Sequence, residues 1–328
     1  MSKKFLVTGV AGFIASNVCR VLLDQGHQVT GVDNMNDYYD VRLKEWRLGQ
    51  LLESSNANNF SFRKLDIENH EVLRKLFEDM GGFDAVLNLA ARAGVRYSME
   101  NPHVYLATNS KGTLNLLECM RSFGCRKLAL ASTSSLYAGQ NMPFDEGLAV
   151  NEPLSPYAAS KKAAELLAYS YHKLYGLDIS VLRYFTVFGP AGRPDMSIFR
   201  FIKWIDEGIP IEMFGDGSQS RDFTYVDDIA HGSVEAVREV GYEIINLGGG
   251  RNPVSLNTIV EKLESILGKK AKIDHKPFHI ADIKETWADI GKADRLLGWK
   301  PQVSLDEGLE KSVKWYMDNR EWLKDVQL

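Results

Sequence analysis

The first half of the chain alternates short runs of consecutive apolar residues with longer runs in which apolar residues recur every three to four positions. The short runs are rich in β-branched residues and predict strands at 4–9, 27–33, 60–66, 84–91, 126–133 and 178–185. The longer runs predict helices between them, among them 105–123 and 157–175. This alternation predicts an α/β fold, a doubly wound parallel sheet of Rossmann type with helices on both faces.

The rhythm changes after residue 185. A stretch rich in glycine and proline, TVFGPAGRPDM, is followed by shorter elements, one further strand at 243–250 and a largely helical tail with a short strand near 269–275. We therefore expect a nucleotide-binding domain made of 1–183 and 223–247. A smaller α/β substrate domain should comprise 184–222 and 248–328.

The composition narrows the class of protein. A chain of 328 residues with 45% hydrophobic and 25% charged residues and a formal net charge of −4 offers no basic stretch for nucleic acid or an anionic membrane. Its three cysteines lack the spacing of a zinc site or a disulfide framework, so we expect no metal. The short apolar run at the N-terminus does not fit a signal peptide, and we expect a cytoplasmic protein.

A glycine loop follows the first predicted strand. In VTGVAGFIAS, Gly9 and Gly12 allow a tight turn and a close approach of a pyrophosphate to the start of the next helix. Asp33 ends the second strand about twenty residues later, where a carboxylate accepts hydrogen bonds from the ribose hydroxyls of NAD. No arginine follows it to hold a 2′-phosphate, so NAD is favoured over NADP. Asp66, at the end of the third strand, is placed to reach the adenine amine.

The heptapeptide SPYAASK places Tyr157 and Lys161 four residues apart, on one helix face. A free phenol has a pKa of about 10 and is a weak base at neutral pH, but a nearby ammonium favours the phenolate. Thr133 ends the predicted strand in ALASTSSLY, with Ser132, Ser134 and Ser135 as further hydroxyls. Taken alone, the tyrosine can equally be a packing residue and the hydroxyl run a turn.

With TGVAGFIAS, STSSLY and YAASK in this order, the whole chain resembles the extended short-chain dehydrogenase/reductase family of NAD-dependent epimerases and dehydratases. The resemblance implies that Tyr157 is the catalytic base, that Lys161 binds the nicotinamide ribose and that Thr133 is the catalytic hydroxyl. It implies a cofactor site of Gly9, Gly12, Phe13, Ile14, Asp33, Asn34, Asp66, Ile67, Leu89, Ala90, Ala91, Asn109, Tyr157, Lys161 and Tyr184.

Three longer stretches, at 33–48, 88–109 and 182–196, are similar to the UDP-glucuronate 4-epimerases of that family. Relatives that act on neutral hexoses usually carry asparagine where this chain has Thr186. The implied substrate is a UDP-sugar, converted through a 4-keto intermediate with no net redox change. The implied substrate residues are Arg96, Thr133, Ser134, Ser135, Thr186, Arg193, Phe214, Arg221 and Asp282.

Several alternatives remain open on the sequence. The chain can be a 4-epimerase for UDP-glucose or UDP-N-acetylglucosamine, a UDP-glucuronate decarboxylase, or a non-catalytic module that senses NAD(H). His279 stands where many sugar-nucleotide epimerases carry a phosphate-binding arginine. The family pairs the helices at about 105–123 and 157–175 in a homodimer, with Leu114, Leu117, Leu166, Leu167 and Tyr171 as candidate interface residues, although the same residues can be core.

Overall fold

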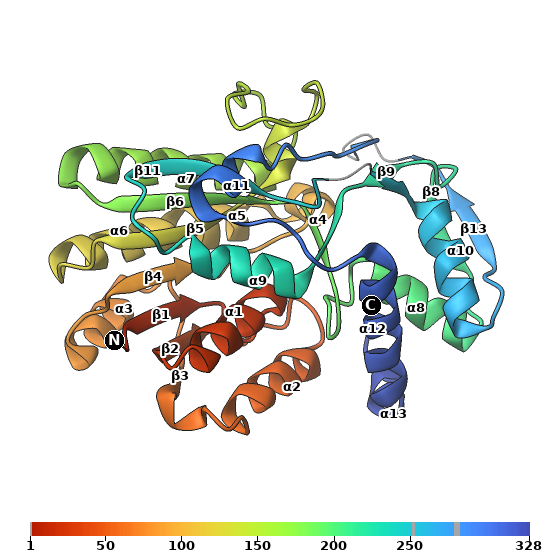
Figure 1. The fold of residues 1–328 in the computed structure, drawn as a ribbon, viewed down its shortest axis with the longest axis horizontal. Coiled ribbons are helices and arrows are strands. Elements are labelled where there is room, and N and C mark those ends of the chain that lie inside the picture. The colour runs from red at the N-terminus through yellow and green to blue at the C-terminus, as the bar shows by residue number, and fades with distance from the viewer. Residues whose placement is uncertain (1, 251–252, 279–282) are drawn as a thin grey trace.

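A computed structural model describes residues 2–250, 253–278 and 283–328 of the chain. Within these residues the strands of the central sheet are all parallel and lie in the order β11-β6-β5-β4-β1-β2-β3. The predicted α/β fold is confirmed (Figure 1). The strands are β1 Lys4–Thr8, β2 Gln28–Asp33, β3 Phe60–Lys64, β4 Ala85–Asn88, β5 Lys127–Thr133, β6 Asp178–Tyr184 and β11 Tyr242–Leu247.

Helices cover both faces of this sheet because successive strand residues point to opposite sides. Phe5 and Val7 of β1 pack into one core layer and Leu6 into the other. The first layer is closed by α1 Phe13–Asp24, α2 Val41–Leu52, α9 Val226–Glu235 and α11 Gly291–Leu297. The second is closed by α3 His70–Met80, α6 Gly112–Ser122 and α7 Pro156–Tyr175.

The helix that we predicted over 105–123 is present and contains a π-helical turn. It runs without a break through α5 Pro102–Tyr105, the π-helical turn Leu106–Lys111 and α6, and the short helix α4 Val95–Glu100 precedes it. A Cβ atom on Gly112 would lie 2.7 Å from Ile67 Cδ1, so the chain passes close to the end of the sheet at this point. The wide turn also aims the Asn109 amide at the backbone of Arg92, which it both donates to and accepts from.

The candidate interface residues separate into two groups. Leu117 and Tyr171 are buried in the core layer beneath the sheet, and Leu114 and Leu167 pack against it. Leu166 is 56% exposed, and Leu174 on the same helix is 70% exposed. The apolar surface of α7 therefore includes Leu166 and Leu174, whereas Tyr171 of α7 and Leu117 of α6 are core.

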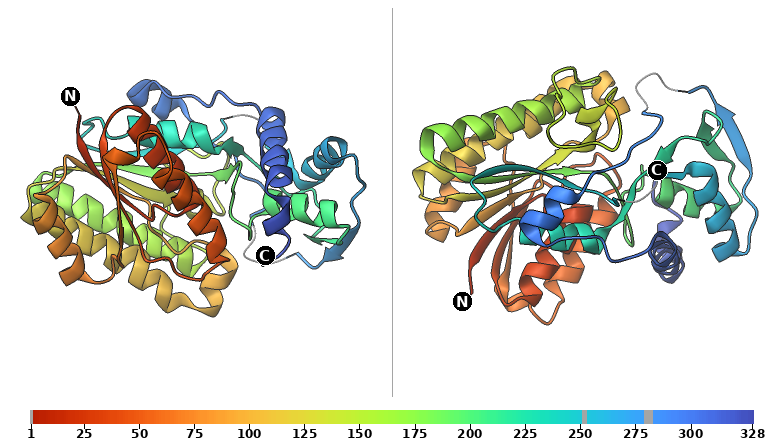
Figure 2. Two further views of the ribbon diagram at one scale, coloured as in Figure 1. Left: turned by 90° about the horizontal axis from the view of Figure 1, so that it is seen from below. Right: turned by 45° about the horizontal axis from the view of Figure 1, so that its top comes forward.

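A smaller group of elements lies beside the carboxyl ends of the strands (Figures 1 and 2). Its core is formed by α8 Ser197–Glu207, α10 Leu256–Leu267, α12 Leu305–Asp318 and α13 Arg320–Leu323, and it also takes in Phe13 and Leu43 from α1 and α2. Its strands form the parallel pairs β8 Ile211–Phe214 with β13 Ile273–Lys276 and β7 Thr186–Phe188 with β10 Phe223–Tyr225, and the antiparallel pair β9 Ser220–Arg221 with β12 Val254–Ser255.

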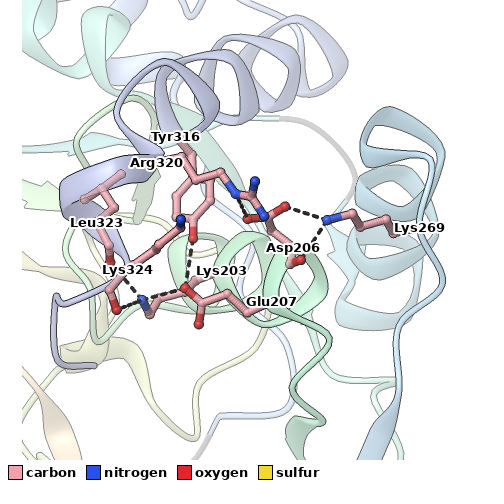
Figure 3. Close-up of polar contacts among 8 residues, drawn as sticks. All are labelled: Lys203, Asp206, Glu207, Lys269, Tyr316, Arg320, Leu323 and Lys324. Atoms are coloured by element: carbon pink, nitrogen blue, oxygen red, sulfur yellow. Dashed lines mark hydrogen bonds and ion pairs between the residues drawn. The ribbon is translucent and has the colours of Figure 1, made fainter.

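Buried charges fix α8 to the C-terminal helices (Figure 3). The Asp206 side chain is fully buried and accepts from Lys269 at 2.7 Å and from Arg320. Lys203 donates to Glu207 and to the backbone carbonyls of Leu323 and Lys324. Because α8 carries cavity residues such as Ser197 and Arg200, this network supports one wall of the cavity described below.

We expect Asp206→Asn to lower the free energy of unfolding by about 2 kcal/mol at pH 7. Burial alone would raise the pKa of Asp206, but the hydrogen bonds from Lys269 and Arg320 outweigh it and hold that pKa below its ordinary value. The stabilisation is therefore present above the ordinary carboxyl pKa and is lost as the pH falls through the lower pKa of the folded state.

Urea denaturation at pH 7 and at pH 3 measures this difference. Wild type and variant should differ at pH 7 and converge in acid. Asp294→Asn is the matched control, because its pair with Lys300 is exposed and should contribute less than about 0.5 kcal/mol. An equal loss for both variants at pH 7 would contradict the role assigned to Asp206.

Candidate active site

A cavity of about 700 Å³ opens at the carboxyl ends of the parallel strands, between the sheet and the smaller group of elements. Its floor includes the ends of β1 and β4, which are neighbours in the sheet although β2 and β3 lie between them in the sequence. The strand order reverses at this point, and open α/β sheets bind ligands at such a switch point. The volume lies within the range of sites for drug-sized ligands and cofactors.

The β1–α1 loop forms one end of the cavity. Gly9 has a φ of 69°, and a Cβ atom there would lie 2.8 Å from Ala90 Cα. The Gly12 amide donates to the Gly9 carbonyl, and α1 then begins at Phe13 without a side-chain cap. This places uncapped helix N–H groups at the cavity, where they favour an anion. Ala15 is buried in the core, consistent with close packing of helix and strand.

Two carboxylates follow at the ends of β2 and β3. Asp33 accepts hydrogen bonds from the backbone amides of Ala11 and Met35, at 3.1 and 2.8 Å. Asp66 accepts from the Asn34 side chain at 2.8 Å and from the Glu68 amide. Both carboxylates line the cavity. The loop is thus folded around Asp33, whose remaining lone pairs can accept from a ribose.

Tyr157, Lys161 and Thr133 come together at the middle of the cavity. Ser155 caps α7 by accepting from the Ala158 amide, and Pro156 follows at the first helical position, which sets Tyr157 in the first turn. Lys161 lies one turn further and donates from Nζ to the Ala131 carbonyl at 2.9 Å. Thr133, the last residue of β5, hydrogen-bonds to Tyr157.

The electrostatics of this group differ from our expectation in one respect. We expected Lys161 to hold the pKa of Tyr157 below its ordinary value; in the protein alone, burial raises that pKa, opposed by the Thr133 hydrogen bond and the Arg193 charge. Burial also lowers the pKa of Lys161 to about 8, opposed by the charge of Glu165. A further positive charge beside the phenol is therefore needed to favour the phenolate at neutral pH.

Hydroxyl groups and arginines line the other half of the cavity. Ser134 and Ser135 continue from Thr133 into a 3-10 turn, and Thr186 begins β7 opposite them. Ser132 also lines the cavity, but its hydroxyl donates to the buried Glu165 at 2.6 Å.

Arg193 lies near Tyr157 but is not an isolated charge. Its Nε donates to Asp195 Oδ1 at 3.0 Å and its Nη2 to Oδ2. The guanidinium of Arg96 lies 3.8 Å from the centre of the Phe214 ring, a cation–π contact that joins α4 to β8. Arg221 also lines this end of the cavity.

Most of the predicted site residues thus lie around one cavity. Asn109 does not line it; its amide instead orients the backbone of Arg92 from behind. Asp282 and His279 lie outside the described residues.

Sequence reasoning missed several lining residues, namely Asn36, Tyr38, Lys44, Arg92, Arg200 and Gln219. The first three belong to the polar stretch 33–48 that we had singled out, so a signal for them was present.

Comparison with known proteins agrees with this geometry. Residues 5–248 match the model of the NAD dependent epimerase/dehydratase family. The chain belongs to this family.

A UDP-glucuronate 4-epimerase of Thermodesulfobacterium geofontis is 60% identical over 99% of each chain. Among solved structures of the epimerase/dehydratase fold, the UDP-glucuronic acid 4-epimerase of Bacillus cereus, in complex with UDP-glucuronic acid and NAD, has a TM-score of 0.89 and 39% identity over 96% of this chain and 99% of that one. The UDP-glucose 4-epimerase of Thermotoga maritima has a TM-score of 0.85 and 30% identity over 97% and 99%.

No helix among the described residues is long and apolar enough to cross a membrane. No group of three or more histidine, cysteine, aspartate or glutamate side chains in the same part of the chain is arranged to hold a metal ion.

Proposed function

We propose that the protein is a UDP-glucuronate 4-epimerase that converts UDP-glucuronate to UDP-galacturonate through a transient 4-keto intermediate, with NAD as its cofactor. The observation that carries this proposal is the full-length identity of 60% to a UDP-glucuronate 4-epimerase, in a chain whose Tyr157, Lys161 and Thr133 meet in one cavity beside Thr186. The structure with UDP-glucuronic acid and NAD from Bacillus cereus supports the same substrate and cofactor.

The residues at the β1–α1 loop fit NAD. A Cβ atom on Gly9 or Gly12 would lie within 3 Å of backbone atoms, so the turn requires glycine at both positions and keeps the start of α1 open to a pyrophosphate. Asp33 would hold the adenosine ribose, Asp66 the adenine, and Lys161 the nicotinamide ribose. The cationic nicotinamide ring would supply the positive charge that the Tyr157 phenolate needs, and NAD would accept a hydride from carbon 4 and return it to the opposite face.

In the mechanism we propose, Tyr157 removes the proton of the 4-hydroxyl while the hydride leaves carbon 4. Thr133, hydrogen-bonded to Tyr157, holds the reacting oxygen. The keto-sugar then rotates about its diphosphate linkage, which Arg221 contacts, and presents its other face. Tyr157 returns the proton to the oxygen as the hydride returns, so the enzyme ends each cycle in its starting state.

The substrate carboxylate needs restraint during the keto stage. A 4-keto uronate is a β-keto acid, and it loses carbon dioxide when the bond to the carboxylate stands perpendicular to the ring carbonyl. We assign the restraint to the hydroxyls of Thr133, Ser134, Ser135 and Thr186. Arg193 contributes less positive charge to this restraint than an unpaired arginine would, because Asp195 neutralises it.

We expect Thr186→Ala to raise the KM for UDP-glucuronate by roughly ten- to hundredfold, the value of one hydrogen bond to a charged group. It should also raise the fraction of turnovers that end in carbon dioxide and a UDP-pentose derivative. Product analysis by chromatography measures both effects. Thr186→Ser is the matched control, since it keeps the hydroxyl, and should resemble wild type. An unchanged KM and product ratio in the alanine variant would contradict the restraint role.

A UDP-glucose or UDP-N-acetylglucosamine 4-epimerase is the nearest alternative, and the similarity to the Thermotoga maritima enzyme supports it at lower identity. Separate kcat/KM values for the three UDP-sugars decide between them, and we expect UDP-glucuronate to exceed both neutral sugars by at least about tenfold. A higher value for a neutral sugar would contradict the assignment. A decarboxylase would release carbon dioxide in every turnover, and an NAD(H)-sensing module would turn over none of them.

Three further expectations stay proposals. A division into 1–183 with 223–247 and 184–222 with 248–328 is supported by the core of the smaller group, most of whose residues lie in 184–222 and 248–328. A homodimer formed through α6 and α7 is supported by exposed Leu166 and Leu174. A cytoplasmic location is supported by the three cysteines, which are all free and buried.

A further inference from the structure

A buried carboxylate lies one helical turn beyond Lys161 on α7. The Glu165 side chain is 2% exposed, and its two oxygens accept from Ser132 Oγ at 2.6 Å and from Arg183 Nε and Nη2 at 2.9 and 2.8 Å. Arg183 is 1% exposed, so the pair is fully enclosed in protein. The mechanism above assigns no part to either residue.

The partners of Glu165 are adjacent to the site in sequence. Ser132 and Arg183 face each other in the β5–β6 register, and the next pair in that register is Thr133 with Tyr184, both of which line the cavity. The Lys161 ammonium donates to the carbonyl of Ala131, one residue earlier on β5. Glu165 thus ties α7 to the ends of both strands at the positions that carry the reacting groups.

A buried ion pair is weak evidence for a stabilising role, because the cost of desolvating two charges offsets most of their attraction. The position of Glu165 one helical turn from Lys161, against the strand whose Ala131 carbonyl Lys161 binds, is a better reason for a carboxylate here. Burial drives the pKa of Lys161 down to about 8, and the Glu165 charge opposes that fall. Other titratable or charged groups near Lys161 or Glu165 are Tyr157 and Lys162 on α7, Arg183 and Tyr184 on β6, and Tyr242 on β11.

We propose that Glu165 is a positioning residue for catalysis: held by Arg183 and Ser132, it fixes the turn of α7 that carries Lys161 against the end of β5, and through Lys161 it acts on Tyr157. This inference rests on the catalytic roles of Lys161 and Tyr157 in the proposed function. It goes beyond them by assigning a requirement for a negative charge outside the cavity.

The test is Glu165→Gln, which keeps the shape of the side chain and removes its charge. Without that charge Lys161 loses its proton at a lower pH. The fall of kcat on the alkaline side of its pH profile, the alkaline limb, should therefore shift to lower pH by about one unit. Glu165→Asp keeps the charge and should restore the wild-type limb. Asp178→Asn is the control, since Asp178 pairs with buried Lys127 at the other end of β6; it should lower stability and leave the limb in place.

A second readout needs no turnover. Because Lys161 lines the cavity, labelling by an amine-reactive reagent as a function of pH, followed by peptide mass spectrometry, reports its pKa directly. We expect the midpoint to fall by about one unit in Glu165→Gln. If that variant does not fold because Arg183 is left unpaired, Glu165→Gln is made together with Arg183→Met and compared with Arg183→Met alone, so that the two proteins differ only in the charge at residue 165.

The outcomes separate the two proposals. A wild-type protein that turns over no UDP-sugar would remove the proposed function, while the labelling midpoints would still decide the effect of Glu165 on Lys161. A labelling midpoint that is the same in wild type and in the charge-removing variant would overturn the inference whatever the activity. A shifted midpoint with an unmoved kcat limb would also overturn it, because Glu165 would then have no bearing on catalysis.

Discussion

Replacing Tyr157 by phenylalanine is expected to lower kcat for UDP-glucuronate about 10³-fold, within the range for loss of a general acid–base group. The phenol is the group next to Thr133 and Lys161 that can take and return the proton of the 4-hydroxyl, and phenylalanine has no proton to exchange. The ring itself packs edge-on against Tyr105 and remains in the variant, so KM should change less than about threefold.

Initial rates with saturating UDP-glucuronate measure this effect, and the absorbance of NADH reports whether any hydride transfer remains. Tyr137→Phe is the matched control. Tyr137 is a buried tyrosine outside the cavity whose hydroxyl donates to Asn246, and its loss should cost about 1 kcal/mol of stability and leave kcat within about twofold. A Tyr157→Phe variant that keeps a tenth of wild-type kcat would contradict the assignment of the base.

Replacing Gly9 by alanine is expected to abolish retention of NAD and to lower the free energy of unfolding by about 3 kcal/mol. The left-handed φ of 69° strains any residue with a Cβ, and here the added atom would also lie 2.8 Å from Ala90 Cα, in the neighbouring strand end. The strand ends that form the cavity floor must therefore move apart, and the pyrophosphate loses its close approach to α1.

The Gly26→Ala variant separates the backbone strain from the steric clash of the added Cβ atom. Gly26 has a φ of 79° but nothing within 4 Å of the position of a Cβ, so the variant carries the backbone strain without the clash. It should lose about 1 kcal/mol and retain its cofactor. Chemical denaturation and extraction of the nucleotide from both purified variants give the comparison. Equal losses in the two variants, or NAD retained by Gly9→Ala, would contradict the close-approach argument.

The elements of the large sheet could be predicted because each is a short buried run with a clear turn or cap on either side. The 105–123 helix was predicted, but its π-helical turn at Leu106–Lys111 could not be foreseen from its own residues. The close approach of Gly112 to Ile67, far away in the sequence, could not be foreseen either. Leu117 and Tyr171 could not be told apart from surface residues for the same reason, since burial depends on what another segment covers.

The same distinction applies to the candidate site: residues at strand ends could be predicted, and features that depend on side-chain geometry could not. Gly9, Asp33 and Asp66 stand at strand ends, where topology alone brings side chains together. The neutralisation of Arg193 by Asp195 and the use of Ser132 by Glu165 depend on side-chain geometry that spacing does not encode. The raised pKa of Tyr157 could not be predicted from spacing either, because burial, rather than Lys161 on the same helix, dominates that pKa.

The central claim is that this chain interconverts UDP-glucuronate and UDP-galacturonate with a cofactor that it regenerates in every turnover. A proton NMR time course of the purified protein with UDP-glucuronate, without added NAD, tests it most directly. The claim predicts UDP-galacturonate as the product, with no accumulation of UDP-pentose. Release of carbon dioxide with a UDP-pentose would contradict the restraint of the carboxylate, and conversion of UDP-glucose but not of UDP-glucuronate would contradict the substrate.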